Sequence, residues 1–168
     1  MPQISLPQVV VVGSQSSGKS SILEALVDCD FLPRGRDICT QRPLVLMLKN
    51  RATVPGDEHI EWGEFRHLPG KRFYDFSTIH HEIQAKTDWE VGLNKGVSDK
   101  QIRLKIISPN VLNMTLVDLL GSTKVLVGEQ PRDIEAMVRK MIMDYIIQQN
   151  CIILAVSLAN SEESGNSL

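Results

Sequence analysis

The chain has few cysteines, few aromatic residues and no long apolar run. Its 168 residues hold three cysteines and 5% aromatic residues, and its longest apolar runs, such as residues 152–156, are short. Three widely spaced cysteines suit neither a disulfide framework nor a zinc site, and they indicate a reducing compartment. Runs this short exclude a membrane span, which needs about 20 apolar residues. No charged-then-apolar signal pattern opens the sequence. We therefore expect a soluble, cytoplasmic chain.

An excess of charge of either sign is also missing. The 18 Lys and Arg residues nearly balance the 20 Asp and Glu residues, so the net charge is -2. A nucleic-acid binder usually carries a basic face, and we therefore expect no nucleic-acid partner. The fractions of hydrophobic residues (42%) and charged residues (23%) are typical of a folded globular domain.

Apolar β-branched runs alternate with helical patterns along the chain. Strands are predicted over residues 8–12, 44–48, 101–107, 113–118 and 151–156. The last has the composition of a fully buried strand, but without later strands beside it we expect it to become an exposed edge. Helices are predicted over residues 20–27, 77–87 and 131–145. Residues 49–75 resemble an insertion, and residues 160–168 a frayed polar tail. This order predicts an α/β fold of three layers around a mostly parallel sheet.

A complete phosphate-loop motif follows the first predicted strand. Residues 13–20 (GSQSSGKS) match G-x-x-x-x-G-K-[ST], and a helix is predicted directly after them. In such a loop, glycines let backbone N–H groups surround phosphate oxygens at the start of a helix, where the dipole favours anions. Lys19 would reach the β- and γ-phosphates, and the Ser20 hydroxyl would bind Mg²⁺. A glycine-rich turn with an exposed lysine is the alternative.

Two further residues fit a phosphoryl-transfer site. Asp118 ends a predicted strand and begins a D-x-x-G pattern that closes at Gly121. The carboxylate would hold Mg²⁺, and the Gly121 N–H would sense the γ-phosphate. Thr40 lies between the first helix and the second strand, where a GTPase switch threonine completes the Mg²⁺ shell. A strand-ending turn and an ordinary loop threonine are the alternatives.

The sequence contains no guanine-recognition motif of the form [NT]-K-x-D. Asn94-Lys95 is followed by Val97 at the Asp position, and Thr123-Lys124 is followed by Leu126. The motifs alone therefore leave the choice between GTP and ATP open.

Taken together, these segments resemble the dynamin superfamily of large GTPases. The resemblance rests on residues 6–21 (LPQVVVVGSQSSGKSS), 30–35 (DFLPRG), 38–40 (ICT), 42–46 (RPLVL), 116–119 (LVDL) and 127–135 (VGEQPRDIE). Residues 61–69 (EWGEFRHLP) and 72–76 (RFYDF) are most similar to the plant-type members that divide mitochondria and peroxisomes. The resemblance implies a dynamin-type GTPase domain with a switch loop over residues 34–43.

The resemblance also implies roles for individual residues. Gln15 would orient the attacking water, and Thr40 would take part in catalysis with it. Ser16 would bind a monovalent cation, K⁺ or Na⁺, together with the backbone of Gly35 and Asp37. The nucleotide, GTP or GDP, would be held by Ser14, Gln15, Ser16, Ser17, Gly18, Lys19, Ser20, Ser21, Arg34, Gly35, Asp118 and Gly121.

The sequence departs from the family pattern at several positions. Leu120 replaces the proline of D-L-P-G, Leu126 replaces a second proline, and Gln41 replaces an arginine of the switch loop. Asp28-Cys29 stands where the family has Gly-Arg. The family pattern ends near Asn160, so the chain is expected to be the first part of a GTPase domain, without its later strands.

Two functions compete at this point. The first is GTP hydrolysis with Mg²⁺, which in the family is coupled to membrane fission of mitochondria and peroxisomes. Its implied partners are the organelle membrane, microtubules, and further copies or full-length dynamin-related proteins. The second is a non-catalytic fragment that only pairs or interferes with such partners. Intact Lys19, Thr40 and Asp118 favour the first, whereas Leu120 and the missing guanine motif favour the second. An ATPase is a distant third.

Overall fold

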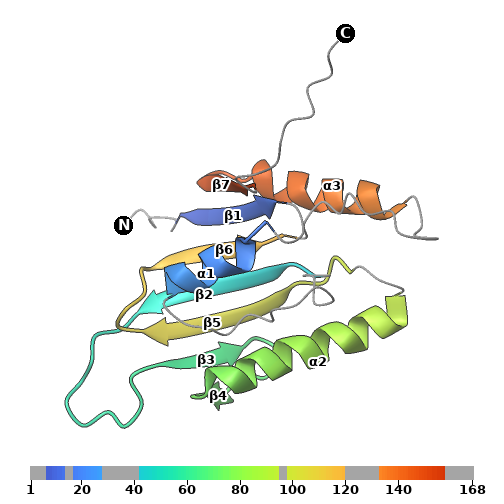
Figure 1. Ribbon diagram of the computed structural model, residues 1–168. Coiled ribbons are helices and arrows are strands. Elements are labelled where there is room, and N and C mark those ends of the chain that lie inside the picture. The colour runs from blue at the N-terminus through green and yellow to red at the C-terminus, as the bar shows by residue number, and fades with distance from the viewer. Residues whose placement is uncertain (1–6, 14–16, 28–41, 95–97, 120–132, 158–168) are drawn as a thin grey trace.

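The computed structural model describes residues 7–13, 17–27, 42–94, 98–119 and 133–157, and Figure 1 shows their arrangement. In chain order, the elements are β1 (Gln8–Gly13), α1 (Lys19–Val27), β2 (Leu44–Asn50), β3 (Trp62–Phe65), β4 (Arg72–Phe73), α2 (Phe76–Asn94), β5 (Ile102–Ser108), β6 (Met114–Asp118), α3 (Asp133–Ile146) and β7 (Cys151–Val156). The predicted α/β class is confirmed.

All of these strands lie in one sheet, in the order β4-β3-β5-β2-β6-β1-β7. β6 and β7 run parallel to β1 on either side of it, and β5 runs parallel to β2. β2 runs antiparallel to β6, and β3 runs antiparallel to β4 and to β5. The sheet is therefore mixed, and its parallel part around β1 is where the phosphate loop is predicted.

Neighbouring residues of β1 face two different cores. Val11 packs in a cluster with Leu23 of α1 and Ile79 of α2, whereas Val10 packs in a second cluster with Tyr145 of α3. Side chains alternate between the two faces of a strand, so these clusters lie on opposite sides of the sheet. β1 is thus covered on both faces, as its continuous β-branched run predicts. The expected three layers are present.

The helices agree with the predicted ones in place but not always in length. α1 begins one residue earlier than predicted, and α2 continues past residue 87 to Asn94. Asp75 caps the start of α2, because its Oδ1 accepts a hydrogen bond from the Ser77 amide at 2.8 Å. Pro131, predicted to start the third helix, lies outside the described residues. None of the described helices is long and apolar enough to span a bilayer.

Residues 49–75, predicted only as an insertion, contribute two strands to the sheet. β3 and β4 form its outer edge, and α2 lies along them (Figure 1). Gly63 of β3 allows this close packing, since a Cβ there would lie 2.5 Å from Ile79 Cδ1. The ring of Trp62 on β3 is contacted by two arginines: the guanidinium groups of Arg51 and Arg72 lie 5.0 and 4.8 Å from its centroid. β3 is only four residues long, and its apolar alternation is too brief to be recognised in sequence.

The two strands joined by the turn at residues 108–110 do not pair with each other. β2 lies between β5 and β6, parallel to the first and antiparallel to the second. Asn50 at the end of β2 stabilises this arrangement, because its Nδ2 donates to the carbonyl oxygens of Pro109 and Val111 at 2.8 and 2.9 Å. A short turn between two apolar strands usually indicates a hairpin, and here it does not.

β7 has the composition of a fully buried strand, but it lies at the edge of the described sheet, as we expect when no later strand pairs with it. It pairs only with β1, and no other described strand lies on its outer side. Ile152 is 58% exposed and Ile153 is 45% exposed. The strand has neither charge nor proline, which are common means of protecting an edge from pairing with another chain.

We predict that Ile152→Lys will reduce self-association of the 168-residue chain. A lysine on an exposed edge discourages pairing with a second copy, and the half-exposed site tolerates the charge. Sedimentation velocity over a range of protein concentrations measures the effect. Met47→Lys is the matched control, because Met47 is 47% exposed but lies on an inner strand. Equal association of the parent and Ile152→Lys would contradict the prediction.

Candidate functional site

The phosphate-loop motif begins where β1 meets β7. A Cβ on Gly13 would lie 2.4 Å from the carbonyl oxygen of Val156 and 2.8 Å from Ser17 Oγ. No side chain fits there, so the first glycine of the motif is required by close packing. Gly18 has φ +94°, a backbone conformation that favours glycine at the second fixed position.

α1 begins with the lysine and serine of the motif. Lys19 is 7% exposed, and its Nζ donates a hydrogen bond to the Gly13 carbonyl oxygen at 2.9 Å. Ser17 is also buried, and its Oγ has no hydrogen-bond partner among the described residues. The first amides of a helix have no acceptor within it, and they add donors beside these two side chains. The start of α1 is therefore a place suited to an anion.

Asp118 lies at the same edge of the sheet, at the end of β6. It stands opposite Val11 in the parallel register of β6 with β1. Its carboxyl group is fully buried, and neither Oδ1 nor Oδ2 has a hydrogen-bond partner among the described residues. Burial raises the pKa of Asp118 to about 7, although the positive charge of Lys19 lowers it in part. A buried carboxyl group without partners is costly in the charged form.

The unpaired oxygens make this site suitable for a divalent cation next to phosphate. Carboxylate and hydroxyl oxygens are the ligands that Mg²⁺ prefers. Asp118 ends β6 and Ser20 lies in the first turn of α1, so both types of ligand occur in the elements that form this site. Lys19 would then face the phosphate groups. The residues present therefore fit a magnesium–nucleotide complex.

The structure brings together only part of the predicted site. Ser17, Gly18, Lys19, Ser20 and Asp118 gather at the carboxyl ends of β1 and β6, whereas Ser21 is exposed on α1. The other predicted site residues lie outside the described residues: Ser14, Gln15, Ser16, Arg34, Gly35, Asp37, Thr40 and Gly121. Leu120, the departure in D-x-x-G, lies outside them as well.

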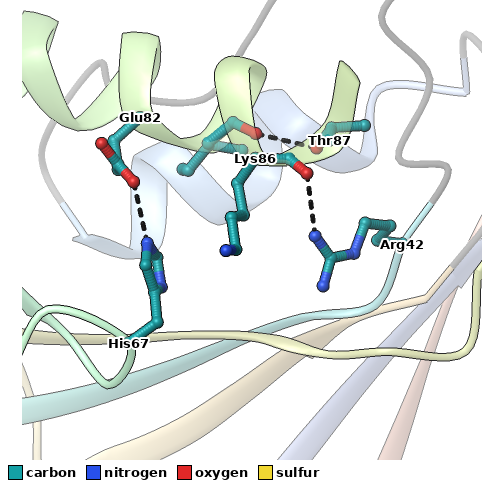
Figure 2. Close-up of polar contacts among 6 residues, drawn as sticks. Arg42, His67, Glu82, Lys86 and Thr87 are labelled. Atoms are coloured by element: carbon teal, nitrogen blue, oxygen red, sulfur yellow. Dashed lines mark hydrogen bonds and ion pairs between the residues drawn. The ribbon is translucent and has the colours of Figure 1, made fainter. Parts of the chain in front are cut away.

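Arg42 is a structural anchor that carried no predicted role. It is 5% exposed, and it donates from Nε to the Lys100 carbonyl at 2.8 Å and from Nη1 to the Lys86 carbonyl at 3.0 Å. Figure 2 shows the second of these bonds, from Arg42 to the backbone of α2. Burial lowers the pKa of Arg42, and the negative charge of Glu90 opposes that shift. Arg42 thus fixes the start of β2 to α2 and to the segment before β5.

The comparisons with known proteins identify the family. Residues 9–167 match the family described as "Dynamin family". The chain belongs to the dynamin family. It is 68% identical over 160 residues to Dynamin-related protein 3A of Arabidopsis thaliana, covering 95% of this chain and 20% of that protein. It is 57% identical over 160 residues to Dynamin-A of Dictyostelium discoideum, covering 95% of this chain and 19% of that protein.

A further relative is human dynamin-1, which is 54% identical over 159 residues, covering 95% of this chain and 18% of that protein. The chain thus spans about one fifth of the length of the curated relatives it matches. The resemblance to dynamin-type GTPases, including the plant members, is confirmed.

We predict that Asp118→Asn will stabilise the nucleotide-free chain at pH 8 and change it little at pH 4. The folded-state pKa of about 7 lies above the ordinary 3.8, so the folded chain binds the proton more tightly than the unfolded chain. Stability is then lost as pH rises from about 4 to about 7, by several kcal/mol. Asparagine removes that loss. Urea unfolding of the parent chain and of Asp118→Asn at both pH values, without Mg²⁺ or nucleotide, measures the effect. The same difference in free energy of unfolding at pH 4 and pH 8 would contradict the raised pKa.

We predict that Arg42→Gln will lower the free energy of unfolding by about 2–4 kcal/mol. The variant loses two charge-assisted hydrogen bonds to backbone carbonyl groups and leaves the buried Glu90 without its nearby arginine. Arg139→Gln is the control, because Arg139 is exposed on α3. Chemical denaturation measures both variants. A loss for Arg42→Gln no larger than for Arg139→Gln would contradict the role of Arg42 as an anchor.

Proposed function

We propose that the chain binds guanine nucleotide with Mg²⁺ and hydrolyses GTP as part of a dynamin-type GTPase. The observation that supports this most is the buried Asp118 carboxyl group without hydrogen-bond partners, at the strand end beside Lys19 and Ser17. The unpaired oxygens of this carboxyl group are suited to a metal ion that binds together with the nucleotide. Membership of the dynamin family adds to the support.

In this proposal, the start of α1 holds the phosphates. Lys19 leaves the Gly13 carbonyl oxygen and turns to the β- and γ-phosphates, while backbone amides of the loop donate to the phosphate oxygens. Ser20 and Asp118 hold Mg²⁺, and Thr40 completes its ligands. The bound ion supplies positive charge that offsets the charge developing on the phosphates during transfer. Protonated Asp118 would have to release its proton before it could bind the ion.

The remaining roles follow the family resemblance. Gln15 orients the attacking water, and Gly121 donates its N–H to the γ-phosphate. Ser16 binds K⁺ or Na⁺ together with the backbone of Gly35 and Asp37. Ser14 of the loop, Ser21 near the start of α1, and the switch-loop residues Arg34 and Gly35 line the nucleotide. Since the protein only positions and stabilises charge in this chemistry, small displacements of these residues would lower turnover.

The cellular role is a further part of the proposal. Its support is the similarity to Dynamin-related proteins 3A and 3B of Arabidopsis thaliana. We propose that the whole protein acts from the cytoplasm in membrane fission of mitochondria or peroxisomes, and that it associates with copies of itself or with full-length dynamin-related proteins. Microtubule contact belongs to the same family-based expectation.

A second candidate function is a non-catalytic interaction module. Its support is the exposed edge strand β7 together with the absence of an [NT]-K-x-D motif from the 168 residues. Single-turnover hydrolysis of GTP and of ATP by the chain, with K⁺ or Na⁺ present, separates the two functions. Hydrolysis of GTP supports the first function, and binding to a dynamin-related partner without hydrolysis supports the second.

We predict that Lys19→Ala will abolish nucleotide binding, because it removes the cation that faces the β- and γ-phosphates. A titration with a fluorescent GTP analogue in the presence of Mg²⁺ measures the affinity. Lys49→Ala is the matched control, since Lys49 is exposed on β2. It should bind like the parent chain. Unchanged affinity in Lys19→Ala would rule out the phosphate-loop assignment.

A further inference from the structure

A second basic site lies away from the phosphate loop, where β3 ends and β5 begins. It is an open pocket of about 310 Å³ lined by Arg66, His67, Gln101 and Arg103. The Arg66 amide donates to the Arg103 carbonyl oxygen at 3.0 Å, which holds the two arginines side by side on neighbouring strands. Among the described residues, no carboxylate lines the pocket itself, although that of Glu82 lies 2.8 Å from the lining residue His67.

The side chains of this pocket are partly fixed in place. Arg103 Nε donates to Gln101 Oε1 at 2.9 Å, and the Gln101 amide donates in turn to the Tyr145 hydroxyl of α3. At another side of the pocket, His67 Nε2 lies 2.8 Å from Glu82 Oε1 of α2, and Figure 2 shows this contact between the turn after β3 and the helix. Helices on both faces of the sheet therefore orient the pocket, which limits the ordering that a ligand would have to impose.

No ion pair with another described residue compensates the positive charge of the two arginines. Within the described residues, Arg66 makes no side-chain hydrogen bond or ion pair, and Arg103 makes its side-chain hydrogen bond to a neutral amide. Other arginines of the chain are engaged differently: Arg51 pairs with Asp57 at 3.0 Å, and Arg42 binds two carbonyl groups. Arg66 and Arg103 thus present guanidinium groups that remain able to bind an external anion.

The pocket is separate from the candidate nucleotide site. The strand order β5-β2-β6-β1 puts two strands between β5 and β1. At about 4.8 Å between neighbouring strands, their axes lie roughly 14 Å apart. Both sites lie at the same edge of the sheet, since β5 runs antiparallel to β1 and begins where β1 ends, so their separation is sideways across β2 and β6. Figure 1 shows β1 and β5 on either side of β2 and β6.

We propose that this pocket binds a small soluble anion that carries a phosphate group. Planar guanidinium groups bind phosphate oxygens through paired hydrogen bonds, and two of them side by side suit a doubly charged group better than a single carboxylate. Gln101 and His67 add polar contacts at the rim. The pocket volume of about 310 Å³ suits one small soluble anion. The site does not depend on nucleotide binding at Lys19.

The test is a calorimetric titration of the Lys19→Ala chain with inorganic pyrophosphate at low salt. This background removes the lysine of the phosphate loop, so the remaining binding reports the second pocket. We expect one site, weakened about tenfold by Arg66→Gln or Arg103→Gln and abolished by both together. Arg103→Lys should restore only part of the affinity, because a lysine cannot form the paired contact. Arg139→Gln, an equal change of charge on α3, should have no effect.

Three results would overturn the proposal. They are no pyrophosphate binding to Lys19→Ala, binding that survives loss of both pocket arginines, and equal weakening by Arg139→Gln. Should Lys19→Ala not fold, the parent chain and its Arg66→Gln/Arg103→Gln variant give the same comparison through loss of one of two sites. A second experiment measures binding of the chain to phosphatidylcholine vesicles that contain phosphatidic acid. Binding to these vesicles through the two arginines, without pyrophosphate binding, would overturn the assignment of a soluble ligand.

Discussion

The parallel pairing of β1 with β6 brings a buried carboxyl group to the place where the phosphate loop begins. Val11 stands opposite Asp118 in this pairing, and Lys19 follows on the helix that β1 leads into. Apolar side chains pack on both faces of β1, so the strand beside Asp118 is buried. Burial without hydrogen bonds raises the pKa of Asp118 to about 7, while Lys19 acts against that shift. The charged form of Asp118 is therefore costly in the free chain, and a bound cation would lower that cost.

The rest of the fold positions this pair and keeps it in place. Gly13 allows β7 to pack closely against the start of the loop, because a Cβ at this position would clash with the Val156 carbonyl oxygen. On the other side, Arg42 ties the start of β2 to α2 and to the segment before β5. β2 in turn pairs with β6, so the anchor at Arg42 is one strand away from Asp118. The strands of residues 49–75 extend the sheet away from the site and provide the surface on which α2 packs.

Local patterns in the sequence were sufficient for the elements around the site. The β-branched run of β1, the spacing of Gly13, Gly18 and Lys19, and the place of Asp118 at a strand end all depend on neighbouring residues in the chain. The remaining features depend on residues far apart in sequence. Pairing of β2 between β5 and β6 requires contacts across some 60 residues, and the bonds of Arg42 reach partners 44 and 58 residues away. The exposure of β7 depends on which strands flank it, so it is predicted by the order of the elements along the chain and not by the composition of β7 itself.

We predict that Asp118, with a pKa of about 7, is partly protonated at neutral pH and loses this proton when Mg²⁺ and nucleotide bind. A ¹³C NMR titration of the Asp118 carboxyl group, in the free chain and then with Mg²⁺ and GTP, measures this directly. Asp118→Asn identifies the signal. We expect a midpoint near pH 7 in the free chain and, in the complex, a midpoint at or below the ordinary 3.8. The same midpoint in both states, or an ordinary midpoint in the free chain, would contradict it.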